Sequence, residues 1–262
     1  MAARSFVLAS LPYKSMPGNV YERKNGNFKL SLVTSYKLPY GVIPRLLLCF
    51  LTREAVRKKS KVIVLGDSLA DFMRNLGFIH ISGGRWGSIT RLKEGVKRLF
   101  SCMITVQWED KENTLIKNIL PVSQAQIYNW WNQNPEQKSL WESTVTLTEE
   151  FYQELTTSPI PFRISTLGML KSSPLAIDIY LWSSYRNSYI VRETMIPWQY
   201  LIAQFGSNVP HTPRGFADFK KSFTRGLEKV AAVYPSAEKL RITPKGLLFV
   251  PAPPDLPKLK SE

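Results

Sequence analysis

The chain has 262 residues, of which 44% are hydrophobic and 12% aromatic, and its formal net charge is +15. This composition is typical of folded globular proteins and excludes a disordered chain, and the length accommodates one large or two modest domains. Such a positive charge favours a polyanionic partner: DNA, RNA or an anionic membrane surface. No apolar run reaches the roughly 18 residues that span a bilayer, and the first residues lack a signal-peptide layout, so we expect a cytoplasmic protein with no membrane partner.

The N-terminal segment, residues 1–30, combines prolines, glycines and asparagines with scattered charges and has no clear period. We interpret it as a flexible basic arm, which would track phosphates, bind a partner or only increase solubility. Leu30 and Leu32 then indicate a strand. A long helix over 43–58 carries Pro44 in its first turn, where the missing N–H is harmless, and 62–64 is a short strand.

Two helices separated by Gly83 and Gly84 follow, and each has an apolar stripe with helical spacing. The stripes contain Leu69, Phe72, Met73 and Leu76 in the first helix and Ile89, Leu92, Val96 and Leu99 in the second. Gly77 is suited to cap the end of the first helix. A short helix packed behind a basic helix is typical of a helix-turn-helix, and the alternating segment over 102–122 predicts the hairpin of a wing.

The polar side of the second helix and the residues just before it supply the first set of candidate DNA-binding residues. They are Arg85, Trp86, Ser88, Arg91, Lys93, Lys97 and Arg98. Arginine forms paired hydrogen bonds with guanine or phosphate, whereas the lysines are expected on phosphates. An isolated charged helix face is more often only solvated, and Trp86 would either insert at the DNA surface or pack under the wing.

The second half of the chain repeats this order of elements. A helix over 173–185 is followed by a strand over 194–196 and a short helix from Pro197 to Gly206. A second basic helix has its apolar stripe at Phe216, Phe219, Phe223, Leu227 and Val230, and a hairpin over 239–250 follows. The second set of candidate DNA-binding residues is Arg214, Lys220, Lys221, Thr224, Arg225, Lys229 and Lys245.

An internal repeat of this length is strong evidence of organisation. We therefore predict a mainly α fold with small β-wings, of the α+β class, made of two tandem winged-helix domains. The predicted division is an arm over 1–30, a first domain over 31–135, a linker over 136–155, a second domain over 156–254 and a loose tail over 255–262. The aromatic stretch over 129–135 is interpreted as part of the connection between the domains.

Several patterns argue against catalysis. The letters Gly66-Asp67-Ser68-Leu69 match a lipase-type motif, but neither histidine has an aspartate three positions before it. A nucleophilic serine without a base is inactive, and Ser68 or Asp67 is better interpreted as a helix N-cap. No phosphate-binding loop is present, and the cysteines and histidines lack metal-ligand spacing. We expect buried free thiols at Cys49 and Cys102, no cofactor, no metal and no enzymatic activity.

Long segments of the chain resemble a known family. They are LPYGVIPRLLLCFLTREAVRKKSKVIVLGDSLADFMRNLGF, GGRWGSITRLKEGVKRLFS, SPLAIDIYLWSSYR, IPWQYLIAQFGS and FKKSFTRGLEKVAAVYP. They are similar to the plasmid-encoded RepA family of replication initiators over residues 36–254. The resemblance implies binding to iteron repeats at a plasmid origin, origin opening, recruitment of the host helicase and initiator, and exchange between dimers and monomers.

Two other functions remain open at this point. A winged-helix repressor of a plasmid operon would use the same two modules and would not support replication. A basic RNA-binding protein would prefer single-stranded or structured RNA, although the aromatic patterns of common RNA-binding modules are absent from the sequence.

Overall fold

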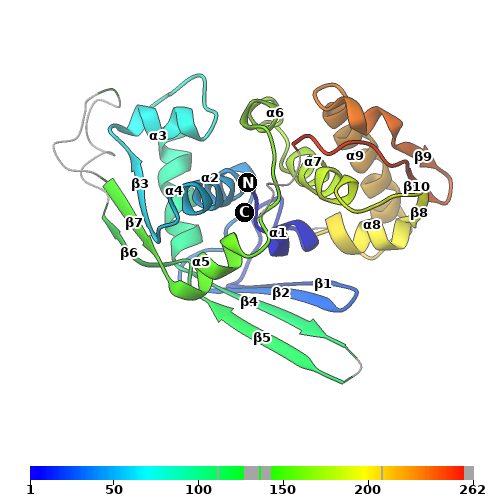
Figure 1. Ribbon diagram of the computed structural model, residues 1–262, viewed down its shortest axis with the longest axis horizontal. Coiled ribbons are helices and arrows are strands. Elements are labelled where there is room, and N and C mark those ends of the chain that lie inside the picture. The colour runs from blue at the N-terminus through cyan, green and yellow to red at the C-terminus, as the bar shows by residue number, and fades with distance from the viewer. Residues whose placement is uncertain (111, 127–135, 137–142, 208, 257–262) are drawn as a thin grey trace.

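The computed structural model describes residues 1–110, 112–126, 136, 143–207 and 209–256. The fold is a mixed α+β arrangement in which the two halves of the chain lie side by side (Figure 1). An N-terminal segment precedes them and contains α1 (Arg4–Leu8), β1 (Val20–Asn25) and β2 (Phe28–Thr34). The α+β class predicted from the sequence is confirmed.

The elements of the first half are α2 (Val42–Lys58), β3 (Val62–Gly66), α3 (Leu69–Asn75), α4 (Ser88–Phe100), β4 (Cys102–Glu109), β5 (Thr114–Ile119), β6 (Val122–Gln126), β7 (Ser143–Leu147) and α5 (Glu149–Thr156). The elements of the second half are α6 (Ile164–Met169), α7 (Pro174–Asn187), β8 (Thr194–Pro197), α8 (Trp198–Phe205), α9 (Pro213–Ala231), the 3₁₀ helix η1 (Pro235–Lys239), β9 (Arg241–Thr243) and β10 (Gly246–Phe249). Both predicted basic helices are present, as α4 and α9.

Each half contains a three-stranded antiparallel sheet of the same plan, ordered β3-β7-β6 in the first half and β8-β10-β9 in the second. In each half, the strand after the long first helix pairs with the second strand of a later hairpin: β3 with β7, and β8 with β10. Both halves therefore share the order helix, strand, helix, helix, hairpin, with β4 and β5 inserted after α4 in the first half.

The basic helix of each half packs against the first long helix through a glycine. A Cβ atom at Gly95 of α4 would lie 2.2 Å from Cγ2 of Ile43 in α2. One at Gly226 of α9 would lie 2.9 Å from Cδ1 of Ile179 in α7. Real Cβ atoms do not approach other atoms so closely, so the missing side chain permits both close helix contacts.

The N-terminal segment differs from the flexible arm that we expected. Ala3, Val7, Leu11, Tyr21 and Phe28 are all buried in the core. The β1 strand pairs with β2 in an antiparallel hairpin. Each element here is short, so its apolar residues have too few repeats to show a period, and the packing that orders them comes from residues far along the chain.

The predicted first wing is also wrong. Strands β4 and β5 join β1 and β2 in a four-stranded sheet ordered β1-β2-β4-β5, and the hairpin beside β3 is β6–β7 instead. Ile104 of β4 pairs with Leu32 of β2, and both side chains are buried. Alternation along a strand reports which face is buried and does not report which strand is the partner. The predicted connection over 129–135 lies outside the described residues.

Residues 143–155, within the predicted linker over 136–155, are packed. Val145 and Leu147 of β7 are buried, as are Phe151 and Leu155 of α5, which contacts α2. Thr148 caps α5, because its Oγ1 accepts a hydrogen bond from the Phe151 amide at 3.2 Å.

The start of the predicted tail is anchored as well. The Asp255 carboxylate accepts hydrogen bonds from the Tyr180 hydroxyl and from Nε of Arg163. The predicted boundary at residue 255 therefore falls one residue too early, since Asp255 belongs to the packed second half; the last six residues lie outside the described part of the chain.

The two halves are joined by a buried ion pair between the long helices α2 and α7. Nε and Nη2 of Arg45 donate to the two carboxylate oxygens of Asp178 at 2.7 and 2.8 Å. Nη1 and Nη2 of Arg45 also donate to the carbonyl oxygens of Pro12 and Leu11 at 3.2 and 2.8 Å. Every carboxylate oxygen is paired in a fork geometry, so this contact holds the helices at a fixed position relative to each other.

The letters of the lipase-type motif form a helix start, as predicted. Oγ of Ser68 accepts a hydrogen bond from the Asp71 amide at 3.1 Å and caps α3, and Gly77 follows that helix with a φ of +86°. Cys49 and Cys102 are buried free thiols, as predicted. Burial raises the pKa of the Cys49 thiol to about 12.

Candidate nucleic-acid interface

Helix α9 presents several basic residues to solvent on one side, where the acidic residues Asp218 and Glu228 are also exposed. Its N-cap is Thr212, whose Oγ1 accepts a hydrogen bond from the Gly215 amide at 3.0 Å, and Pro213 occupies the first turn. Of the predicted stripe, Phe219, Phe223, Leu227 and Val230 are buried and Phe216 is partly buried. This burial fixes the rotation of the helix, so that the side chains on the opposite side are exposed. They include Arg214, Lys221, Arg225 and Lys229.

A groove of about 630 Å³ lies between α9 and the β9–β10 hairpin. The helix contributes Lys220, Lys221, Thr224, Arg225 and Glu228 to its walls, and the hairpin contributes Ile242, Thr243 and Pro244. The Lys220 ammonium lies 4.5 Å from the Phe216 ring centroid and 5.2 Å from that of Trp198. Cation–π contacts of this kind hold a positive charge in the groove.

The hairpin is held rigidly against α8. Nε1 of Trp198 donates to the carbonyl oxygen of Thr243 at 3.2 Å, and Oγ1 of Thr243 accepts from the Gly246 amide at 3.1 Å. Gly246 has a φ of +158°, and a Cβ atom there would lie 2.0 Å from the carbonyl oxygen of Ile196. Only glycine fits this position. The exposed Lys245 precedes it at the turn of the hairpin.

Helix α4 and the residues just before it carry a second exposed basic group. Arg85, Arg91 and Lys97 are exposed, and Trp86 is 80% exposed. The Arg85 guanidinium carbon lies 5.2 Å from the Trp86 ring centroid. The Trp86 side chain is therefore presented to solvent beside a cation, and the alternative in which it packs under a wing is wrong.

Two residues of the first candidate set point elsewhere. Ser88 is 2% exposed, and its amide and Oγ form hydrogen bonds with Ser82. The Arg98 side chain is 12% exposed and forms an ion pair with Glu94 at 3.0 Å. The segment 34–40 covers this flank of α4, because Arg98 also donates to the Leu38 carbonyl oxygen and lies 4.8 Å from the Tyr40 ring centroid.

The remaining candidates are at the edges of the exposed faces. Lys93 on α4 and Lys220 and Thr224 on α9 are partly buried. Sequence reasoning missed Arg241, an exposed residue in the first strand of the hairpin beside the α9 groove. Its position in the predicted hairpin was the only signal available from the sequence. Within the described residues, no cluster of histidine, cysteine, aspartate and glutamate could hold a metal ion.

Comparison with known proteins places the chain in a family. The family model described as plasmid-encoded RepA protein matches residues 38–200, which is more than half of the chain. The chain belongs to the RepA family of plasmid-encoded proteins. This confirms the resemblance to replication initiators found in the sequence. Helix α9 lies beyond the matched residues, so its candidate role rests on its own geometry.

Two solved structures have the same fold as this RepA-family chain. A crystal structure of RctB domains 2-3, residues 155–483, has a TM-score of 0.58 at 13% identity and covers 86% of this chain and 82% of that chain. A selenomethionine crystal structure of domain 2 and domain 3 of RctB has a TM-score of 0.63 at 12% identity and covers 97% of both chains. At such identities the likeness shows the fold alone. The search of curated proteins finds no match.

No helix in the described part of this RepA-family chain is both long enough and apolar enough to cross a membrane.

Proposed function

We propose that this RepA-family chain initiates plasmid replication by binding repeated duplex sites through α4, α9 and their adjacent hairpins. Membership of the family supports a role in plasmid replication initiation. The observation that carries the proposal for duplex binding is the exposed row of Lys221, Arg225 and Lys229 on α9, beside a rigid hairpin. A helix with one buried and one basic face, next to a hairpin, matches the shape and charge of a major groove and its flanking phosphates.

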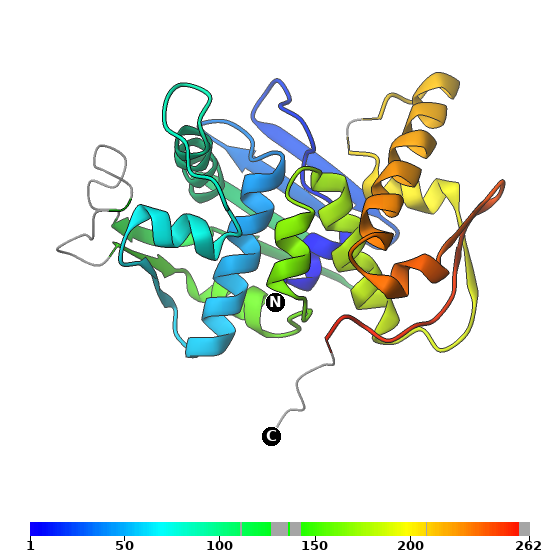
Figure 2. The same cartoon turned by 90° about the horizontal axis from the view of Figure 1, so that it is seen from above.

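The distance between the two basic helices is fixed by the core. The contacts run from α4 to α2, from α2 to α7 and from α7 to α9, and Figure 2 shows α2 and α7 between the two basic helices. The buried pair of Arg45 and Asp178 joins the two central helices of this series. We propose that one protomer uses this fixed arrangement to read two successive major grooves on one face of the duplex, about 10 base pairs apart.

Within each groove, the residues have different roles. Arg91 and Arg225 contact base edges, because arginine forms paired hydrogen bonds with guanine. Lys97, Lys221 and Lys229 contact phosphates and set affinity without reading sequence. Arg241 and Lys245 extend the phosphate contacts along the second hairpin.

The later steps of initiation extend the proposal on the basis of family resemblance. Several protomers bound to direct repeats bend the origin and strain an adjacent segment until it opens. The assembled protomers then recruit the host helicase and the host initiator. An inactive homodimer in equilibrium with the active monomer limits the number of bound protomers.

Fluorescence anisotropy tests the duplex proposal. The probes are a duplex with the plasmid's own direct repeats and a scrambled duplex of the same composition, each titrated across a salt series. We expect the repeats to bind at least about 10³-fold more tightly at physiological salt. Equal binding that disappears steeply with salt would leave only counterion release, and the proposal would be wrong. A minimal-origin replication assay separates an initiator from an operon repressor.

A further inference from the structure

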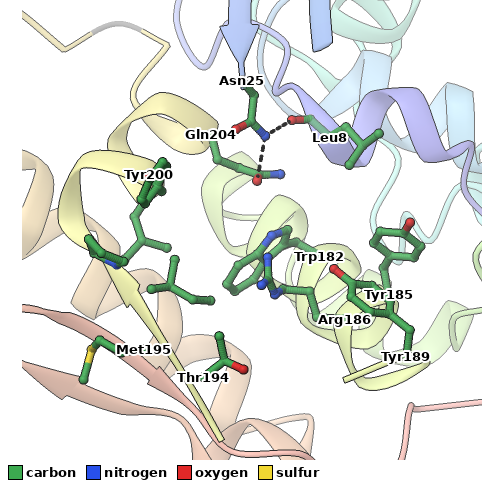
Figure 3. Close-up of a pocket in the computed structure, with 13 residues that line it drawn as sticks. Leu8, Asn25, Trp182, Tyr185, Arg186, Tyr189, Thr194, Met195, Tyr200 and Gln204 are labelled. Atoms are coloured by element: carbon green, nitrogen blue, oxygen red, sulfur yellow. Dashed lines mark hydrogen bonds between the residues drawn. The ribbon is translucent and has the colours of Figure 1, made fainter. Parts of the chain in front are cut away.

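A second cavity, of about 300 Å³, lies where the N-terminal segment meets the second half of the chain. Its walls come from α7, β8, α8 and the segment after α7, with Leu8 and Asn25 completing one side (Figure 3). None of the residues that line it belongs to the groove beside α9. The candidate duplex interface therefore makes no use of this site.

Arg186 of α7 gives the cavity an unbalanced positive charge. Its Nε atom is buried without a hydrogen-bond partner, and its guanidinium forms no ion pair within the described residues. The guanidinium carbon lies 5.1 Å from the Trp182 ring centroid, and none of the lining residues is acidic. Burial lowers the pKa of this guanidinium from its ordinary value. A partly buried guanidinium without an acidic partner favours an anion beside it.

Aromatic rings flank the cavity on two sides. Tyr200 of α8 is 57% exposed and Tyr189 is 49% exposed, and Figure 3 shows them on opposite sides of Trp182 and Arg186. The rings of Tyr185 and Tyr189 contact each other at a centroid distance of 5.1 Å. Tyrosines on opposite walls offer π-faces to a planar ring that enters between them.

The side-chain amide nitrogens of Asn25 and Gln204 in the cavity wall donate hydrogen bonds within the protein. Nδ2 of Asn25 donates to the carbonyl oxygen of Leu8 at 2.7 Å and to Oε1 of Gln204 at 3.0 Å. Nε2 of Gln204 in turn donates to the carbonyl oxygen of Val7. These bonds fix the N-terminal segment against α8. Among the lining residues, the charged group left for a ligand is the guanidinium of Arg186.

We infer that this cavity binds one nucleotide unit, with the base between Tyr200 and Tyr189 and the phosphate on Arg186. Its volume lies at the lower end of the range of about 300–1,000 Å³ for small-molecule sites. Bases inside a duplex are paired and stacked and cannot enter such a site. The unit is therefore either a free nucleotide or an unpaired nucleotide of a single strand. The inference does not depend on the proposed duplex binding.

The test uses the full chain with two kinds of probe. A fluorescein-labelled octamer of thymidylate is followed by anisotropy, and dTMP, dAMP and inorganic phosphate are titrated by calorimetry. We expect Tyr200→Ala and Arg186→Gln each to weaken the binding of nucleotide probes by about tenfold, through lost stacking and lost phosphate contact respectively. Arg186→Lys should keep part of the affinity.

A neighbouring residue offers a matched control. Arg192 is exposed and does not line the cavity, so Arg192→Gln removes the same charge from the same region and should change probe affinity by less than about twofold. Thermal melting of every variant establishes that it is folded. Tyr200 is at the exposed rim, so its variant keeps the test informative if the Arg186 variant fails to fold.

Each outcome decides the inference. Octamer binding that needs Arg186 and Tyr200, and that dTMP does not displace, supports an unpaired strand as the source of the nucleotide. Calorimetric binding of dTMP or dAMP that needs the same residues supports a free nucleotide. Unchanged affinity in both variants for every probe would overturn the inference, and so would inorganic phosphate binding as tightly as dTMP. All these titrations omit duplex DNA, so they can succeed where the duplex proposal fails.

Discussion

The two basic helices pack in the same way and present different surfaces. Each contacts the first long helix of its half through a glycine, Gly95 in α4 and Gly226 in α9. Arg98 and Lys229 both lie three residues after that glycine, yet Arg98 is covered by the segment 34–40 and Lys229 is exposed. The interface of a helix therefore depends on its neighbours as much as on its own charges. We expect α9 to supply more of the duplex affinity than α4.

The largest expected effect comes from removing the buried ion pair that joins the two halves. Arg45→Ala leaves the Asp178 carboxylate buried without its partner, so we expect a loss of about 3–5 kcal/mol in the free energy of unfolding. Denaturant unfolding followed by circular dichroism measures the change. The double variant Arg45→Met with Asp178→Leu removes both charges and should recover most of the loss. A single variant as stable as the wild type would show that the pair does not join the halves.

The helix contacts themselves can be tested with one substitution in each half. Gly95→Ala meets Ile43 more closely than Gly226→Ala meets Ile179. Overpacking costs about 1–3 kcal/mol, and alanine returns about 1 kcal/mol of helix propensity. We therefore expect Gly95→Ala to destabilise the protein by about 2 kcal/mol and Gly226→Ala by less, in the same unfolding experiment. The reverse order would contradict the packing described for α4 and α9.

The proposed base contacts of Arg225 and Arg91 allow the two helices to be compared in duplex binding. Arg225→Ala in α9 and Arg91→Ala in α4 should each weaken specific duplex binding by about 1–3 kcal/mol and relax specificity at different base pairs. Anisotropy with duplexes substituted at one position at a time measures both effects. Arg192→Ala, which is exposed and outside the candidate interface, is a charge-matched comparison. An arginine whose replacement leaves affinity for the repeats unchanged does not read bases.

The smallest expected effects distinguish Lys229 of α9 from Arg98 of α4, the residues three positions after the packed glycine in each helix. Lys229→Gln should leave stability within about 0.5 kcal/mol and reduce the slope of log affinity against log salt by about 1, as expected for one lost phosphate contact. Arg98→Gln should leave the salt slope unchanged and lower stability by about 1 kcal/mol, because it loses its bonds to Glu94 and Leu38. If Arg98→Gln alone reduced the slope, the covered flank of α4 would be part of the interface.

The sequence predicts the features of this fold that depend on local periodicity. The buried stripes of α4 and α9, the Ser68 cap and the repeated order of elements are all present. The partner of β4 and the packing of residues 1–30 depend on contacts between distant segments, which alternation and composition do not report. The loss of Arg98 from the candidate interface has the same cause, since the segment that covers it lies sixty residues earlier.

The central claim is that one protomer reads two successive major grooves with two helices. Protection of guanine N7 from dimethyl sulfate tests this most directly, because that atom lies in the major groove. On a duplex with one repeat, we predict two protected clusters about 10 base pairs apart on one face. Arg91→Ala should remove one cluster and Arg225→Ala the other. A single cluster, or the loss of both clusters in either variant, would contradict the claim.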